Sequence, residues 1–167
     1  MSKITTLHEL YIEQLQDLLS AEKQLIKALP AMAKASYDSK LKAGFEEHFA
    51  ETKVHAQTVE QILSSHDEKP GTKKCAAMEG LIEEGKEMIS EDAEEAVKDI
   101  GLIAAAQRVE HYEIAGYGCV RTYAKILGYE KDNVVLQGIL DQEGDTDKKL
   151  TKIATTLNLK AELGATK

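Results

Sequence analysis

The chain has 167 residues, of which 43% are hydrophobic and 30% charged, and its formal net charge is −8. This composition is typical of a globular protein, and the length suits one domain over residues 1–167. The acidic balance argues against nucleic-acid binding, which needs a basic surface, and no apolar run is long enough to cross a bilayer.

Good helix formers dominate the sequence and strand-type alternation is nearly absent, so we predict an all-α chain. The first helix is expected over residues 4–35. Pro30 threatens it near its end, where a kink or an early stop would be explained by the missing backbone N–H. The second helix is expected over residues 40–65, and the Pro- and Gly-containing segment 66–72 is the clearest loop in the chain.

Three more helices are expected after this loop. A short one covers residues 75–90, and two long ones cover 94–127 and 132–157, with Gly128 between them and a polar tail after the last. Four long helices with a short one between the second and the third predict a helix bundle. In one common bundle topology a long connection must cross the bundle at that place.

Each long helix carries carboxylates where a bundle should be apolar. A bundle helix buries a stripe of residues spaced three and four apart, and here the middle of every such stripe is interrupted. The interrupting residues are Glu22 in the first long helix, Glu51 in the second, Glu110 and Glu113 in the third, and Glu143 and Asp147 in the fourth. The stripe of the second helix also carries His48 and His55, so all four helices offer potential metal ligands that face inward.

These six carboxylates cannot be buried together without compensation. Burying one unpaired carboxylate costs several kcal/mol, and neighbouring carboxylates repel one another as well. No Lys or Arg lies near them on the same stripes. Protonation would relieve part of this cost by raising the pKa values, but two multivalent cations would relieve far more. Oxygen ligands with an imidazole suit iron or manganese, so we expect two metal ions per chain, with iron favoured.

Each of these residues taken alone also has a simpler interpretation. A single Glu on a helical seam is usually a boundary residue whose carboxylate reaches water. His48 and His55 are each as easily core histidines as ligands, and the pattern leaves open which one serves the second helix. His111 follows Glu110 but lies off the stripe, so we interpret it as structural or as a partner of a ligand. Tyr117 is interpreted as a plain core residue. The recurrence of the pattern in four helices favours a metal site.

The N-terminus and the cysteines indicate the compartment. Residues 1–6 contain no apolar signal segment. Cys75 and Cys119 lack a paired metal-binding spacing, and we interpret them as two reduced thiols rather than a disulfide. We therefore expect a soluble, cytoplasmic protein.

Three segments carry a resemblance to a known family: SAEKQL at residues 20–25, CAAMEGLIEE at 75–84 and VEHYEIA at 109–115. They strongly resemble the YciE/YciF-like family of bacterial ferritin-like stress proteins, and the similarity extends over about residues 7–157. The resemblance implies a ferritin-like four-helix bundle with a short additional helix in the crossover, a homodimer, a rubrerythrin-like dimetal site and a role in the stress response.

The resemblance also implies a set of ligands. By position these are Glu22, Glu51, Glu110 and Glu143, with Glu113 as an added ligand as in rubrerythrin-like sites. The general ferritin pattern has Glu-x-x-His on two helices, and this chain departs from it. The second helix offers Glu51 with His55 four residues later, or with His48 three residues earlier, whereas the fourth offers Glu143 with Asp147 and no histidine. Both spacings share a helical face, so the expected set is completed by His55 and Asp147.

Such a site is compatible with several functions. A dimetal carboxylate protein would react with O2 or H2O2 or handle iron, with Glu51 and Glu110 as the expected bridges. The alternative is a non-enzymatic stress protein that binds metal only structurally and acts through a protein partner. A manganese catalase is a third, weaker hypothesis, and no catalytic residue is assigned by the pattern.

Overall fold

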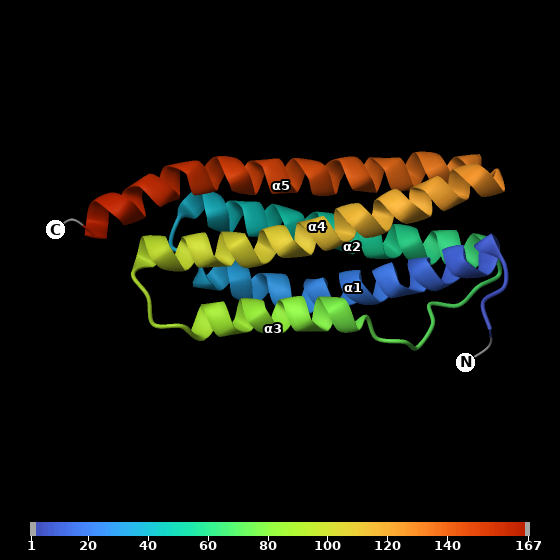
Figure 1. Ribbon diagram of the computed structural model, residues 1–167, viewed down its shortest axis with the longest axis horizontal. Helices are drawn as coiled ribbons and strands as arrows, with labels where there is room; N and C mark the ends of the chain where they lie inside the picture. The colour runs from blue at the N-terminus through green and yellow to red at the C-terminus, as the bar shows by residue number, and fades with distance from the viewer. Residues whose placement is uncertain (1–2, 166–167) are drawn as a thin grey trace.

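A computed structural model of the chain describes residues 3–165, and within this range it contains five helices and no strand. The helices are α1 (Leu7–Ala35), α2 (Ser39–Ser65), α3 (Ala76–Ser90), α4 (Glu95–Leu127) and α5 (Glu130–Ala165). Helices α1 and α2 form one antiparallel hairpin and α4 and α5 a second, while α3 lies on the outside against α1 and α4 (Figure 1). The predicted all-α bundle with a short additional helix is confirmed.

The path of α3 explains the topology of the bundle. The loop after α2 leads back from the end of the bundle where α2 stops, and α3 starts near the middle and runs to the end where α4 starts (Figure 1). Helix α4 therefore runs parallel to α2 and antiparallel to α1, as a crossover between two hairpins requires. Among the described residues, no helix has the combination of length and apolarity that crossing a membrane demands.

Local sequence signals set three of the helix ends. The Thr6 side chain accepts a hydrogen bond from the backbone N–H of Glu9, and the Glu9 carboxylate accepts one from the backbone N–H of Thr6. This reciprocal pair is a capping box that starts α1. Asp38 caps α2 by accepting two backbone N–H groups of its first turn. Gly128 ends α4 with a φ of 77°, a left-handed conformation that glycine adopts without strain.

Helix α1 starts at Leu7 rather than at residue 4 and ends at Ala35 as expected, whereas α5 ends later than expected. Helix α1 continues through Pro30 without stopping, and Pro30 is exposed, so water can hydrate the carbonyl that its ring leaves without a donor. Helix α5 extends to Ala165, so the prediction of a polar tail after Leu157 was wrong. Residues 158–163 contain neither Pro nor Gly, and their Lys, Ala, Glu and Leu residues favour the helix.

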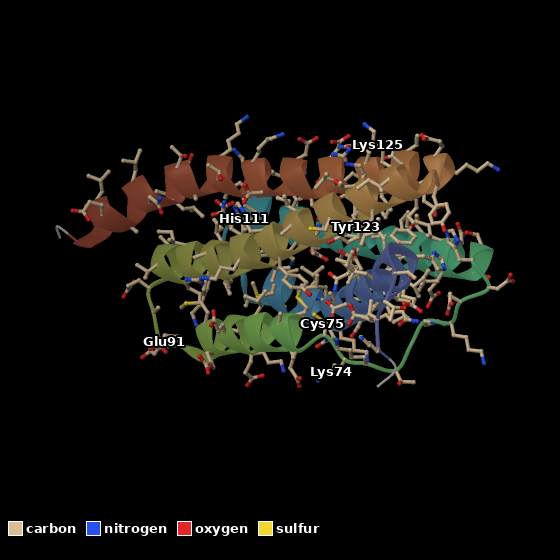
Figure 2. The ribbon with its side chains drawn as sticks, turned by 45° about the vertical axis from the view of Figure 1, so that its right-hand side comes forward. Lys74, Cys75, Glu91, His111, Tyr123 and Lys125 are labelled. Carbon is tan, nitrogen blue, oxygen red and sulfur yellow. The ribbon has the colours of Figure 1, made fainter. Side chains whose placement is uncertain are left out.

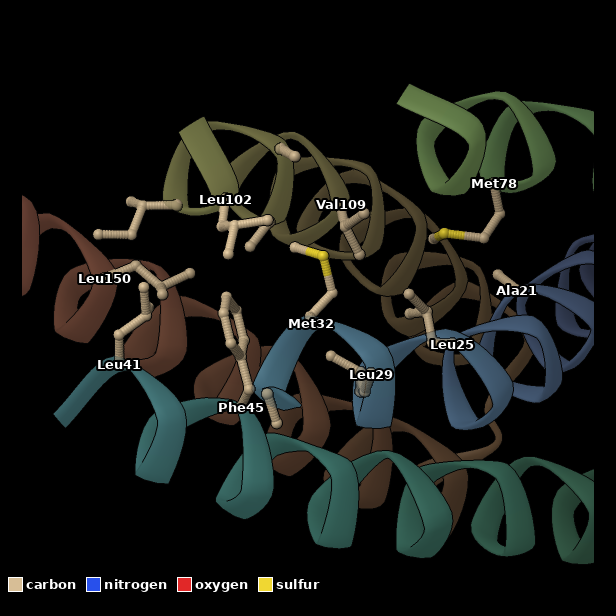
Figure 3. Packing of buried hydrophobic residues seen from close by; sticks show 14 of the residues in the cluster. Ala21, Leu25, Leu29, Met32, Leu41, Phe45, Met78, Leu102, Val109 and Leu150 are labelled. Atoms are coloured by element: carbon tan, nitrogen blue, oxygen red, sulfur yellow. The ribbon is translucent and has the colours of Figure 1, made fainter. Parts of the chain in front are cut away.

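The apolar core consists of two clusters with a polar layer between them. One cluster includes Leu25, Phe45 and Leu102 (Figure 3), and the other includes Leu18 and Val120. Along α1, the residues pass from Leu18 in the second cluster to Leu25 in the first, and the polar layer falls in between. The same change occurs in α2, α4 and α5, so the four long helices place their buried polar residues at one level.

Asp99 on α4 ties the turn between the two helices of the first hairpin to the second hairpin. Its buried carboxylate accepts a hydrogen bond from the backbone N–H of Tyr37 at 2.9 Å and another from that of Asp38 at 2.7 Å. The spacing of apolar residues gave no signal for this contact, because its partners are 61 and 62 residues away.

Replacing Asp99 by Ala should lower the free energy of unfolding by about 2–3 kcal/mol, because two hydrogen bonds to a charged acceptor are lost. Urea unfolding of chelator-treated protein measures this change. Asp92→Ala is the matched control, since it removes an exposed carboxylate at the same end of the bundle and should change stability by less than about 0.5 kcal/mol. Equal unfolding midpoints for Asp99→Ala and the wild type would contradict the assignment.

Candidate metal centre

The polar layer between the two apolar clusters gathers six ionisable side chains from the four long helices. None of them is more than 2% exposed. They are Glu22 of α1, His48 and His55 of α2, Glu110 and Glu113 of α4, and Glu143 of α5. We call these six residues the carboxylate–histidine cluster.

Within the described part of the chain, the cluster divides into two groups whose potential ligand atoms all lie within 4.8 Å of one another. The first group contains His48, Glu110, Glu113 and Glu143. The second group contains Glu22, His55 and Glu143. Glu143 belongs to both groups, so the two groups are adjacent and share one carboxylate.

The short distances in the cluster are not hydrogen bonds. His55 Nδ1 lies 2.9 Å from Glu143 Oε1 and 3.7 Å from Glu22 Oε1. His48 Nε2 lies 3.3 Å from Glu110 Oε1. These His48 and His55 nitrogens nevertheless have no partner with hydrogen-bond geometry among residues 3–163. The contact of His55 with Glu143 is an ion pair when the imidazole is protonated, but none of these nitrogen–oxygen contacts has the geometry of a hydrogen bond.

Unsatisfied polar atoms are concentrated in this cluster. Nine of its buried nitrogen and oxygen atoms lack a hydrogen bond within the part of the chain that the structure describes: Glu22 Oε2, His48 Nδ1 and Nε2, His55 Nδ1, Glu110 Oε2, and both carboxylate oxygens of Glu113 and of Glu143. Buried polar groups in proteins are nearly always paired, so such a set needs an explanation. Carboxylate oxygens and imidazole nitrogens are the ligands of iron and manganese, and the donor set fits such ions.

Two neighbouring side chains fix the orientation of cluster residues. The buried Tyr117 hydroxyl donates a hydrogen bond to Glu22 Oε1 at 2.5 Å. His55 Nε2 lies 2.9 Å from the side-chain oxygen of Gln142. This oxygen accepts a hydrogen bond from the Nε2–H group, so in the neutral imidazole the lone pair is on Nδ1, which faces Glu143. A second hydrogen bond of this kind is how proteins set the tautomer of a metal-ligating histidine.

Burial and mutual repulsion perturb the acidity of the cluster. Burial raises the pKa of Glu22 to about 8, and the charge of Glu143 adds to this effect. Burial likewise raises the pKa values of Glu110 and Glu113 well above the ordinary range of a carboxyl group, again reinforced by Glu143. For His55, burial alone lowers the pKa, but the carboxylates of Glu143 and Glu22 outweigh it and raise the pKa to about 9. The cluster thus holds protons tightly when no cation balances its charge.

The structure brings together five of the seven residues predicted as ligands. These are Glu22, His55, Glu110, Glu113 and Glu143. His48, which the sequence left as an alternative to His55 on the second helix, joins the cluster beside it. The bridging position suggested for Glu51 and Glu110 differs from the geometry, in which Glu143 is the shared residue.

Glu51 and Asp147 lie at the margin of the cluster. Their side chains are 30% and 20% exposed, in contrast to the fully inward position expected from the helical stripes. Glu51 Oε2 is 3.9 Å from His48 Nδ1, and Asp147 Oδ1 accepts a hydrogen bond from Gln107 at 3.0 Å. Neither belongs to the two groups of potential ligands in the described residues, and their role as ligands stays a prediction.

Three other residues singled out from the sequence can also be placed. His111 lies on the exposed surface of α4 with its Nε2 3.5 Å from Asp147 Oδ1, in agreement with its position off the stripe (Figure 2). Cys75 and Cys119 are both free, the first buried at the start of α3 and the second exposed. The Cys75 sulfur lies 3.0 Å from the hydroxyl of Tyr112.

Comparison with known proteins finds relatives along nearly the whole chain. A family model described as a domain of unknown function, DUF892, matches residues 6–162. Protein YciF of Escherichia coli is 45% identical over 159 residues, which cover 94% of this chain and 96% of YciF.

Solved structures agree with this relationship. The crystal structure of the E. coli stress protein YciF superposes with a TM-score of 0.91 at 43% identity, covering 94% of this chain and 99% of that one. YcfI from Rhodopseudomonas palustris superposes at 0.85 with 35% identity, covering 89% and 95%. A ferritin-like, diiron-carboxylate protein from Bacillus anthracis superposes at 0.71 with 18% identity, covering 90% and 99%. The last comparison shows the fold alone, which is that of a ferritin-like bundle.

The pKa shifts predict how the stability of the metal-free protein depends on pH. The folded-state pKa of Glu22, about 8, lies above its ordinary 4.5, and that of His55, about 9, lies above its ordinary 6.5. In both cases the folded chain holds a proton that the unfolded chain releases, so stability is lost as the pH rises. We expect the thermal midpoint of chelator-treated protein to fall by roughly 5 °C or more between about pH 5 and about pH 8.

Thermal unfolding followed by circular dichroism tests this dependence. Glu22→Gln is the control variant, because it removes one of the two titrating groups and should reduce the slope of midpoint against pH. A midpoint that rises over the same interval would show that the cluster is already ionised in the metal-free fold.

Proposed function

The chain belongs to the DUF892 family and is a relative of YciF, and from this premise we propose that it is a dimetal carboxylate protein that reacts with dioxygen or peroxide. The carboxylate–histidine cluster is the observation that carries the proposal. Its buried, unpartnered oxygen and nitrogen atoms come from all four long helices of a ferritin-like bundle and form two groups that share Glu143. This is the place where such bundles hold two metal ions.

The two groups give an assignment of ligands. One ion would be held by Glu22, His55 and Glu143, and the other by His48, Glu110, Glu113 and Glu143. Glu143 then replaces Glu51 and Glu110 as the proposed bridge. Four carboxylates carry a charge of −4 when all are ionised, which two divalent cations balance. Iron is the favoured metal and manganese the alternative, because oxygen ligands predominate and two imidazoles complete the set.

The residues around the cluster prepare it for this role. When bound, iron or manganese supplies Lewis acidity and electrons for the reduction of O2 or H2O2. Tyr117 holds the Glu22 carboxylate through its hydroxyl, and Gln142 holds the His55 ring with Nδ1 toward the cluster. The apolar clusters on both sides exclude bulk water. Glu22 and His55 hold protons in the metal-free state, so metal binding releases protons from them.

The similarity to YciF supports a role in the stress response. YciF is described as a stress protein, and this chain is 45% identical to it. We propose that this chain serves bacterial stress tolerance by consuming oxygen or peroxide or by handling iron. The alternative is a stress protein in which the metal is structural and the activity lies in contact with a protein partner.

Anaerobic reconstitution with ferrous iron should give about two ions per chain by elemental analysis. The double variant Glu22→Ala/Glu143→Ala should retain less than about half an ion, because each group loses Glu143 and the smaller one also loses Glu22. The matched control is Glu46→Ala/Glu84→Ala, which removes two exposed carboxylates and should bind as the wild type does. A wild-type content far below one ion per chain rejects the proposal.

The same variants separate a reactive centre from a structural one. If the double variant stays helical by circular dichroism and loses both metal and the consumption of O2 or H2O2, the reactive centre is supported. If it unfolds, and no consumption is detected with the metal-loaded wild type, the structural alternative stands. Rapid O2 release from peroxide by the manganese form would indicate a catalase.

We also propose that the protein is a homodimer, as its family resemblance implies. Ile126 and Val134 lie near the turn between α4 and α5, and each is 68% exposed, so this end of the second hairpin presents apolar surface that an interface would bury.

Light scattering after size exclusion should therefore give twice the 18.4 kDa mass of one chain. Val134→Glu should shift the protein toward the monomer, because it places a charge in the proposed interface. Leu159→Glu changes an equally exposed residue near the other end of α5 and serves as the control. A wild-type mass of one chain overturns the proposal.

A further inference from the structure

A pocket of about 110 Å³ lies between α1, α3 and α4, and it reaches the carboxylate–histidine cluster. Met32 of α1, Ile82 and Gly85 of α3, and Val109 of α4 line it, and Glu110 forms part of its wall. Figure 3 shows Met32 pointing from α1 toward α4 beside Val109. Because Glu110 is also a member of the first group of potential ligands, the pocket touches the cluster directly.

The pocket is apolar along its buried part. Met32, Ala106 and Val109 are buried, whereas Lys27 and Lys86 are exposed and stand at its outer rim. At the buried end, Glu110 is 1% exposed, and its Oε2 has no hydrogen-bond partner in the described residues. A molecule entering from the rim therefore passes apolar side chains before it reaches Glu110, a member of the cluster.

Gly85 keeps this space open. It is buried in α3, where glycine costs a helix about 1 kcal/mol relative to alanine. At Gly116 of α4, an added Cβ would come 2.7 Å from Leu18 Cδ2, so an alanine there would have to displace the Leu18 side chain. At Gly85, an added Cβ would meet only Met32 Sδ at 3.7 Å, an ordinary contact. Packing does not require glycine at this position, and its effect is to leave the pocket unfilled.

We propose that this pocket is the entry route for dioxygen to the Glu110 side of the centre, which makes a small, uncharged, apolar molecule the substrate class. The proposal rests on the proposed function, since it assigns a substrate to that same site. Apolar walls offer few partners for hydrogen bonds, so peroxide or superoxide would lose hydration on entry and dioxygen would not. Apolar cavities of comparable size in proteins bind xenon or benzene.

Xenon binding tests the pocket without any metal. In metal-free protein, xenon should shift the methyl NMR signals of Met32 and Val109. Gly85→Leu fills the pocket and should weaken xenon binding at least about tenfold.

Gly80→Leu is the matched control, because it makes the same change on the exposed face of α3, where an added Cβ meets nothing within 4 Å. Ala28→Leu, from the α1 wall, repeats the test should Gly85→Leu fail to fold. The proposal is overturned if xenon causes no shifts in the wild type. It is also overturned if the shifts in the pocket-filling variant equal those in the wild type.

Oxygen kinetics then test the route. Stopped-flow oxidation of the ferrous protein, expressed per bound metal ion, should be roughly tenfold slower in Gly85→Leu than in the wild type and unchanged in Gly80→Leu. If Gly85→Leu oxidises as fast as the metal-loaded wild type, the route is rejected. The route is also rejected if the metal-loaded wild type does not react with oxygen. Both results leave the metal binding itself unaffected. A wild type without bound metal rejects the proposed function itself, a result that elemental analysis distinguishes from the first.

Discussion

Burial of negative charge in the middle of a helical bundle is the constraint on which this structure depends. Four carboxylates share one level of the core with two imidazoles and no Lys or Arg partner among the described residues. Their repulsion opposes the packing of the four long helices. Two apolar clusters, one on either side, supply the burial that offsets it. The destabilising polar layer therefore lies between the two stabilising apolar clusters, which hold the helices together on both sides of it.

The same constraint bears on why the two groups of potential ligands are unequal. Helix α5 contributes only Glu143 to the buried cluster, whereas α2 contributes both imidazoles and no buried carboxylate. Glu143 is shared by the two groups, and His48 and His55 fall to different groups. The pocket next to Glu110 adds to the asymmetry, because it approaches the group with more carboxylates. A proposed reaction with dioxygen would begin on that side.

Much of this architecture could be predicted from the sequence. Apolar spacing and helix-end signals gave the helices, and the carboxylates on the seams gave most of the cluster. The register of α2 was ambiguous, because a stripe with spacings of three and four runs as His48–Glu51–His55 or as His48–Thr52–His55. The structure buries Thr52 and leaves Glu51 at the edge. Spacing alone cannot choose between them, since both lie within the width of one helical face.

Contacts between residues far apart in the sequence could not be predicted from the helical periodicity either. Tyr117 reaches Glu22 across 95 positions and Gln142 reaches His55 across 87, and each partner stands on a different helix. Such pairs depend on how neighbouring helices are rotated and shifted against one another. A periodicity along one helix contains no information about that rotation, so it predicted the members of the cluster better than the side chains that orient them.

Neither hairpin contains a complete ligand group. Glu143 of the second hairpin is shared with Glu22 and His55 of the first in one group, and His48 of the first hairpin joins three residues of the second in the other. Any ion held there would act as a cross-link between the two halves of the molecule. The hairpins must therefore dock before either ion is fully coordinated, and an ion that leaves must lose ligands from both. Slow exchange of bound metal would follow from chain topology as much as from ligand strength.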